Sequence, residues 1–242
     1  MKIKMKLAST LVVLTLASAI ATSSHRDEKY SLQTKPNIPW PKKIVYGVDF
    51  KFEMNPELEG LDKSFGMTAT AEVTRINQPN GNYIVRFAFK RSEMNQPIAP
   101  DAKESIEEVS YDKHGKEIKR AESKKAPTEH LTSFMEFEPP TKKVAIGEVW
   151  TVKLPGAQPG GASTTFGAAQ LTGIELVDGT KCFRVEQVFR ESSVDANPTY
   201  STIWIRVSDG FVFKQHWTGA FLPVKIEGTT VSAKATVKLL EG

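Results

Sequence analysis

Residues 164–190 read TTFGAAQLTGIELVDGTKCFRVEQVFR, and this stretch decides the fold. Two runs with many β-branched and apolar residues lie on either side of Asp178-Gly179. An Asp-Gly pair favours the tight turn of a β-hairpin because both positions accept a positive φ angle. The stretch therefore predicts two antiparallel strands, at residues 164–176 and 181–190.

The same pattern continues in both directions along the chain. Residues 200–207 and 211–217 flank Ser208-Asp209-Gly210, and residues 67–76 and 83–91 flank a loop that contains Asn80-Gly81. Further strands are predicted at residues 44–53, 106–111, 117–121, 131–137, 147–154 and 229–240. The hairpin of 106–111 and 117–121 carries charge on both faces, which predicts an exposed edge.

No segment sustains the apolar period of 3.6 residues that a helix requires. The chain therefore predicts an all-β fold with little helix. We expect an antiparallel meander that forms a strongly curved sheet or a half-open barrel, because such a sheet must cover its apolar face. Residues 44–242 are predicted to form one β domain, preceded by a proline-rich extended leader at residues 22–43.

Residues 1–21 have the layout of a secretory signal peptide. Lys2, Lys4 and Lys6 precede an apolar run from Leu7 to Ala21, and small residues follow. The run is shorter than the roughly 20 residues of a membrane-spanning helix. We therefore predict cleavage near Ala21, export to the periplasm or the extracellular space, and no transmembrane anchor in the mature chain.

Charge and cysteine content restrict the classes of partner and site. Three of the 32 basic residues belong to the predicted signal, which leaves 29 against 28 acidic residues, so nucleic acid is not an expected partner. Cys182 is the single cysteine, so no intramolecular disulfide or thiolate metal cluster can form. We interpret Cys182 as a buried, inert thiol.

Catalytic and cofactor motifs were sought without success. Ser110-Tyr111-Asp112-Lys113 matches the catalytic motif Ser-x-x-Lys. It lies in a predicted strand and turn, however, where Ser110 and Lys113 would point to opposite faces. Glu136 and Glu138 share a strand face and could act as a glycosidase pair, but we favour a solvated polar face, because surface carboxylates are routine on half-buried strands. The sequence therefore predicts no catalytic residue, no metal ligand and no cofactor.

Aromatic residues of the last hairpins form the candidate binding surface. Phe211, Phe213 and Trp217 share one face of their predicted strand, and Trp204 belongs to the strand before it. A packed core accounts for this pattern. The functional interpretation is a cavity or groove for an apolar ligand that Trp204, Phe211, Phe213 and Trp217 line.

One resemblance covers residues 144–218. It rests on Gly147-Glu148-Val149-Trp150, on Asp178-Gly179 leading to Cys182, and on the run from Thr202 to Lys214. This order resembles uncharacterised bacterial exported β-sheet proteins and, more distantly, periplasmic lipoprotein carriers of the LolA/LolB type. The resemblance implies an unclosed barrel around an apolar cavity and implies no functional residue.

These observations favour a non-catalytic exported protein that binds an apolar small molecule or a component of the cell envelope. The alternatives are a structural or protein-interaction module of the envelope, and a hydrolase of envelope polymers that uses Glu136 and Glu138. An envelope protein is the partner expected under the first alternative.

Overall fold

The computed structural model describes residues 28–33, 39–41, 43–55, 64–94, 104–113, 117–120, 137, 139–154, 165–191, 197–223 and 230–241. The predicted signal peptide at residues 1–21, the predicted strand at 131–137 apart from Phe137, and the pair Glu136 and Glu138 lie outside these residues.

The described residues form strands and no helix. The strands are β1 (Lys29–Tyr30), β2 (Ile44–Asn55), β3 (Ser64–Asn77), β4 (Tyr83–Met94), β5 (Glu104–Tyr111), β6 (Glu117–Arg120), β7 (Val144–Ala145), β8 (Val149–Leu154), β9 (Thr165–Val177), β10 (Thr180–Glu191), β11 (Thr199–Arg206), β12 (Val212–Pro223) and β13 (Thr230–Glu241).

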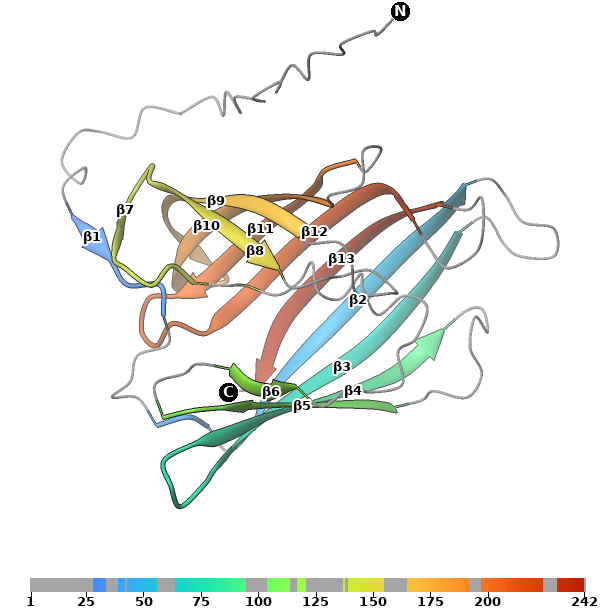
Figure 1. Cartoon of the computed structure of the whole chain (residues 1–242). Coiled ribbons are helices and arrows are strands. Elements are labelled where there is room, and N and C mark those ends of the chain that lie inside the picture. The colour runs from blue at the N-terminus through green and yellow to red at the C-terminus, as the bar shows by residue number, and fades with distance from the viewer. Residues whose placement is uncertain are drawn as a thin grey trace, which may run out of the picture.

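Eleven of these strands form one sheet in the order β6-β5-β4-β3-β2-β13-β12-β11-β10-β9-β8, and every pairing is antiparallel. The sheet consists of two meanders, one running from β2 to β6 and the other from β8 to β13. They join where β13 pairs with β2, so the first and last long strands lie side by side (Figure 1).

The predicted all-β fold is confirmed, and the sheet is open rather than closed. Its edges, β6 and β8, bend toward the same side in Figure 1 and do not pair with each other within the described residues. This curvature lets Phe89 of β4 and Val152 of β8, near opposite ends of the sheet, pack in one hydrophobic cluster. The hairpin β5–β6 lies at an edge, as its charge predicts, and Ile118 of β6 is exposed.

Two hairpins have turns at the predicted positions, and the turn at Asp178-Gly179 has the positive φ angle at both residues that its sequence predicts, whereas at Asn80-Gly81 the glycine alone has one. Asp178 and Gly179 join β9 to β10 with φ angles of 48° and 79°, the positive values that a tight hairpin turn requires at both positions. Gly81 joins β3 to β4 with a φ angle of 83°. Both hairpins are therefore determined by local sequence.

Part of the predicted leader packs into the folded core. Lys29–Tyr30 (β1) pairs with Val144–Ala145 (β7) as a separate two-stranded sheet. Leu32, which follows β1, is 1% exposed and belongs to the main hydrophobic cluster. Burial of such a side chain contributes about 1.5–3 kcal/mol, so this segment stabilises the fold.

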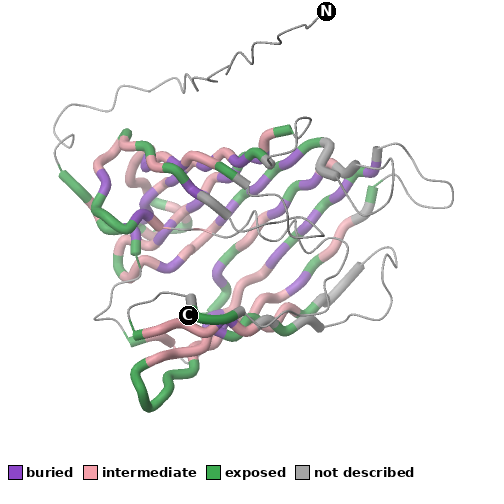
Figure 2. Tube along the Cα trace, in the orientation of Figure 1, coloured by how far each residue is buried: buried purple, intermediate pink, exposed green. Residues whose placement is uncertain are grey.

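Buried and partly exposed residues alternate along the strands, as expected when only one face of a sheet is covered (Figure 2). We call the covered face the inner face. Its core residues on β2 are Val48, Phe50 and Phe52, and those on β10 are Phe183, Val185 and Phe189. The opposite face is called the outer face.

Candidate functional site

The inner face carries the main hydrophobic cluster of the described sheet, and this cluster combines residues that are far apart in the sequence. Strand pairing places Phe50 opposite Ala235, Ala235 opposite Trp217, and Trp217 opposite Ser201. The row continues from Ser201 to Gln187. Because opposite residues in paired strands point to the same side, these side chains form one continuous row across the sheet.

Three of the four predicted aromatic residues lie with the inner-face clusters. Trp217 is 1% exposed and belongs to the main cluster. Phe211 and Phe213 belong to a second cluster that includes Ile44, Val73, Val85 and Leu239. Ile44 shares the even spacing of Val48, so the second cluster lies further along the same face of β2.

A β-bulge sets the position of Phe213. The register passes from Lys214 opposite Trp204 to Val212 opposite Ile205, which leaves Phe213 as the extra residue of β12. The bulge lies between the two clusters, so Val212 packs against the main cluster while Phe213 packs against the second. Phe211 and Trp217 are consequently both buried, but in different clusters.

Trp204 is placed on the outer face, away from the other three residues. Its neighbours Ile203 and Ile205 are fully buried in the main cluster, so the intervening side chain points to the other side. Trp204 Nε1 donates a hydrogen bond to Glu175, and the His216 ring lies edge-on at 5.3 Å. The grouping of Trp204 with Phe211, Phe213 and Trp217 on one surface is therefore corrected, since the period of two assigns it to the opposite face.

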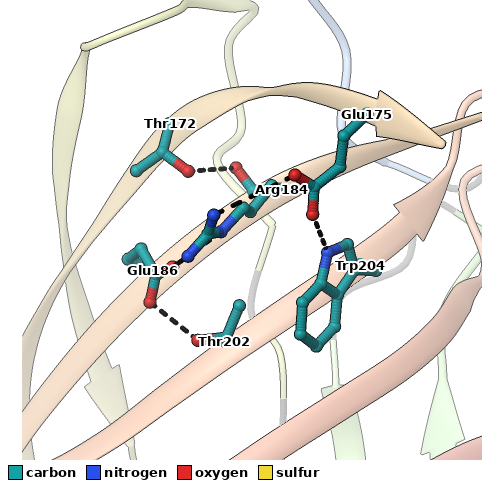
Figure 3. Close-up of polar contacts among 6 residues, drawn as sticks. All are labelled: Thr172, Glu175, Arg184, Glu186, Thr202 and Trp204. Atoms are coloured by element: carbon teal, nitrogen blue, oxygen red, sulfur yellow. Dashed lines mark hydrogen bonds and ion pairs between the residues drawn. The ribbon is translucent and has the colours of Figure 1, made fainter. Parts of the chain in front are cut away.

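The polar surroundings of Trp204 form a paired network on the outer face (Figure 3). Arg184 binds Glu186 through Nη2 at 2.6 Å and Nε at 2.8 Å, and Nη1 lies 3.9 Å from Glu175. Thr202 Oγ1 donates to Glu186 at 2.8 Å. Glu175 and Glu186 thus each have one cationic and one neutral partner. The network therefore has a structural role, since it links β9, β10 and β11.

His216 is the one described histidine, and its surroundings disfavour the charged form. Burial beside Trp204 and the nearby Lys214 ammonium lower the pKa of His216. The other histidines, His25, His114 and His130, lie outside the described residues. Within the part of the chain that the structure describes, no group of histidine, cysteine and carboxylate side chains could hold a metal ion.

Cys182 has the character that its sequence context predicts. The side chain is fully buried, and burial raises the pKa of the thiol to about 11, more than the nearby Arg206 guanidinium lowers it. The thiol is protonated at neutral pH, which makes it a poor nucleophile.

The inner face also contains polar residues that the aromatic pattern did not indicate. Gln187, Thr199, Ser201 and Gln215 are all at most 3% exposed. Gln215 Nε2 donates to Ser201 Oγ at 2.9 Å. A signal was present in the sequence, because Gln187 occupies the apolar phase of β10 between Val185 and Phe189.

On this face, Gln187 and Trp150 carry buried polar atoms with no hydrogen-bond partner in the part of the chain that the structure describes. Neither the Nε2 nor the Oε1 atom of Gln187 is bonded, and neither is Nε1 of Trp150. Trp150 and Gln187 are both opposite Ala169, one from β8 and the other from β10. Burying such a group without a partner costs about 1–3 kcal/mol, so this site is energetically unusual.

At the far end of the inner face, an arginine lies among aromatic rings. The Arg75 guanidinium is 3.8 Å from the ring centroid of Tyr83 and 5.7 Å from that of Trp40. Tyr83 stacks on Tyr111 at 5.2 Å, and Trp40 contacts Phe211 edge-on at 5.1 Å. These contacts pack residues 39–41 against the second cluster.

In the described residues, no helix has the length and apolar character needed to cross a membrane. The described surface has a cleft of about 350 Å³ at the ends of β2, β12 and β13, lined in part by Lys51, Tyr200 and Lys234. Lys51, Lys234 and Tyr200 belong to one row on the outer face, since strand pairing joins them through Thr218. The cleft includes none of the four predicted site residues.

No protein-family model matches this chain, and no curated protein matches it. The chain is similar to the hypothetical lipoprotein YmcC from Escherichia coli K12, with 10% identity, 82% of this chain and 87% of the other covered, and a TM-score of 0.32. A DUF1329 family protein from Desulfovibrio piger has 9% identity, coverages of 83% and 84%, and a TM-score of 0.23. A LolA superfamily protein from Nitrosomonas europaea has 11% identity, coverages of 84% and 86%, and a TM-score of 0.22.

A LolA superfamily protein is thus among the structures similar to this chain, as the sequence resemblance predicts.

Proposed function

We propose that this protein is an exported, non-catalytic binding protein that holds an apolar ligand against its inner face. The observation that carries the proposal is the shape of that face. Eleven strands curve around one apolar surface without closing, and the cluster on it includes residues from β4, β2, β12, β10 and β8. Open curved sheets and incompletely filled barrels are common sites for apolar ligands.

The predicted signal peptide and the charge balance support the same proposal. An exported chain with 29 basic and 28 acidic residues after cleavage has no basic excess for nucleic acid. The described carboxylates nearest to Trp204 are bonded within the outer-face network. We therefore expect a ligand to bind through apolar contacts with the inner face.

Extraction of a native ligand tests the proposal directly. The protein is purified without detergent from the periplasm or medium, and native mass spectrometry is compared with mass spectrometry of its organic extract. We expect an apolar or amphipathic molecule in stoichiometric amount. An unrelated exported β protein, purified in parallel, controls for carry-over, and failure to detect any such molecule or to bind added apolar probes would refute the proposal.

A protein-interaction module is the second candidate, and the edge strand β8 favours it. Val149 of β8 is 58% exposed, and Phe166 of the adjacent β9 is 51% exposed. An unpaired sheet edge with apolar side chains can accept a strand from a partner. In this case a specific envelope protein should crosslink to the wild-type chain and not to Val149→Lys.

A further inference from the structure

The pair of unbonded groups that flank Ala169 indicates which part of a ligand the inner face recognises. Backbones of neighbouring strands are roughly 4.8 Å apart, so Trp150 and Gln187 start roughly 10 Å from each other with one methyl group between them. We propose that this place binds the secondary amide group of an amphipathic ligand, with Gln187 and Trp150 as the recognition residues. This inference rests on the proposed function and specifies its ligand class.

The number of free donors and acceptors leads to an amide. Gln187 offers two N–H donors and one carbonyl acceptor, and Trp150 offers one N–H donor. A trans secondary amide points its carbonyl oxygen and its N–H in opposite directions. Its carbonyl oxygen can therefore accept from Trp150 Nε1 while its N–H donates to Gln187 Oε1, on the two sides of Ala169. An ester or ether has no donor, so the Gln187 carbonyl would remain without a partner.

The surroundings of the pair suit the hydrocarbon part of such a ligand. Ala169 itself is 1% exposed, and Leu171 and Val185 beside it are fully buried. Of the other buried polar side chains of the face, Ser201 and Gln215 are bonded to each other, and Thr199 lies two residues from Ser201 on β11. The unpaired atoms of Gln187 and Trp150 therefore offer hydrogen bonds beside the apolar Ala169, which would fix the register of a bound chain.

Because Gln187 is 3% exposed, a ligand must displace packed side chains to reach it. We therefore expect association to be slower than for a preformed pocket. A buried water molecule on Gln187 is the competing explanation for its unmet bonds, and the experiment below separates the two.

The test compares two probes that differ in one atom. N-Decylacetamide and decyl acetate are titrated into the full purified chain by isothermal titration calorimetry. We expect the wild-type protein to bind the amide about three- to tenfold more tightly than the ester, the effect of one or two net hydrogen bonds. The near-isosteric change Gln187→Met removes the acceptor for the amide N–H and should therefore abolish this preference.

The matched control is Gln215→Met, which changes a glutamine of the same face whose amide already has a partner. It should keep the preference for the amide. Equal affinities for the two probes in the wild-type protein, or an unchanged preference in Gln187→Met, would overturn the inference and favour the water, while the proposed function would stand. Absence of binding for both probes to the wild-type chain would overturn the proposed function and the inference together, and this comparison does not depend on any variant folding.

Discussion

Gln215 and Ser201 are bonded across the inner face, with the amide Nε2 donating to the hydroxyl Oγ at 2.9 Å. Gln187 lies opposite the same serine in the register of β10 and β11, yet its amide has no partner. Two glutamines of nearly equal burial on one apolar face thus differ in whether their hydrogen-bonding groups are satisfied. This difference separates a residue that joins β11 to β12 from the residue that we propose as a ligand contact.

The two glutamines should respond oppositely to removal of the amide. Gln187→Met removes two unsatisfied polar atoms, so the free energy of unfolding should rise by about 1 kcal/mol in ligand-free protein. Gln215→Met removes the donor that is bonded to Ser201, so the free energy of unfolding should fall by about 1–2 kcal/mol. Urea denaturation followed by circular dichroism measures both values, and a comparable loss of stability in Gln187→Met would show that its amide is satisfied in solution.

Gly167 is required by the packing of Phe189. A Cβ atom at residue 167 would lie 2.5 Å from the Phe189 ring and 2.5 Å from the Val188 carbonyl oxygen. Because backbone cannot move aside cheaply, Gly167→Ala should lower the free energy of unfolding by roughly 1–3 kcal/mol. Gly173→Ala, where nothing lies within 4 Å, is the matched control on the same strand and should be nearly neutral. Equal effects of the two changes in thermal denaturation would contradict this account.

Cys182 should be unreactive in the native protein. Its thiol is fully buried and its pKa is about 11, so little thiolate exists at pH 8. Ellman's reagent at pH 8 should label the thiol only after denaturation, at a rate set by unfolding. Rapid labelling of the folded protein would show that the thiol is accessible, and Cys182→Ser provides the blank.

Tyr46 should make stability fall at alkaline pH. Burial raises the pKa of Tyr46 from 10.0 to about 12, more than the Arg206 charge lowers it. Below pH 10 the phenol is neutral in both states, but between pH 10 and about 12 it ionises in the unfolded chain alone, so unfolding becomes easier as the pH rises. The expected loss is on the order of 1 kcal/mol at pH 11. Denaturation at pH 9 and pH 11 should show this loss in the wild-type protein and less of it in Tyr46→Phe.

Tryptophan fluorescence should report which face a ligand occupies. Trp150 and Trp217 lie on the inner face, whereas Trp204 contacts Glu175 and His216 on the outer face. Titration with decyl acetate should therefore change the emission of Trp204→Phe as it does that of the wild-type protein, and the change should shrink in Trp217→Phe. The reverse result would move the ligand to the outer face.

The amino-acid sequence by itself determined the strands and their hairpins. Asp178, Gly179 and Gly81 adopt the positive φ angles of their turns, and the period of two in residues 44–54 separates the faces of β2. These features depend on residues within a few positions of one another. The burial of Cys182 was predicted from its residue type, because free cysteine is among the most buried residues, although its phase along β10 is that of the polar Arg184 and Glu186.

Tertiary structure decided what depends on distant residues. The pairing of β2 with β13 and the β-bulge at Phe213 depend on contacts between remote strands, so local pattern does not contain them. The assignment of tryptophans to the two faces also depends on distant residues. Trp204 and Trp217 both lie in strands with many apolar residues, but the register places Trp204 in the outer-face network and Trp217 in the core. The position of Gln187 beside Ala169 and Trp150 arises only when β8, β9 and β10 align, since an unsatisfied hydrogen bond is a property of the assembled sheet.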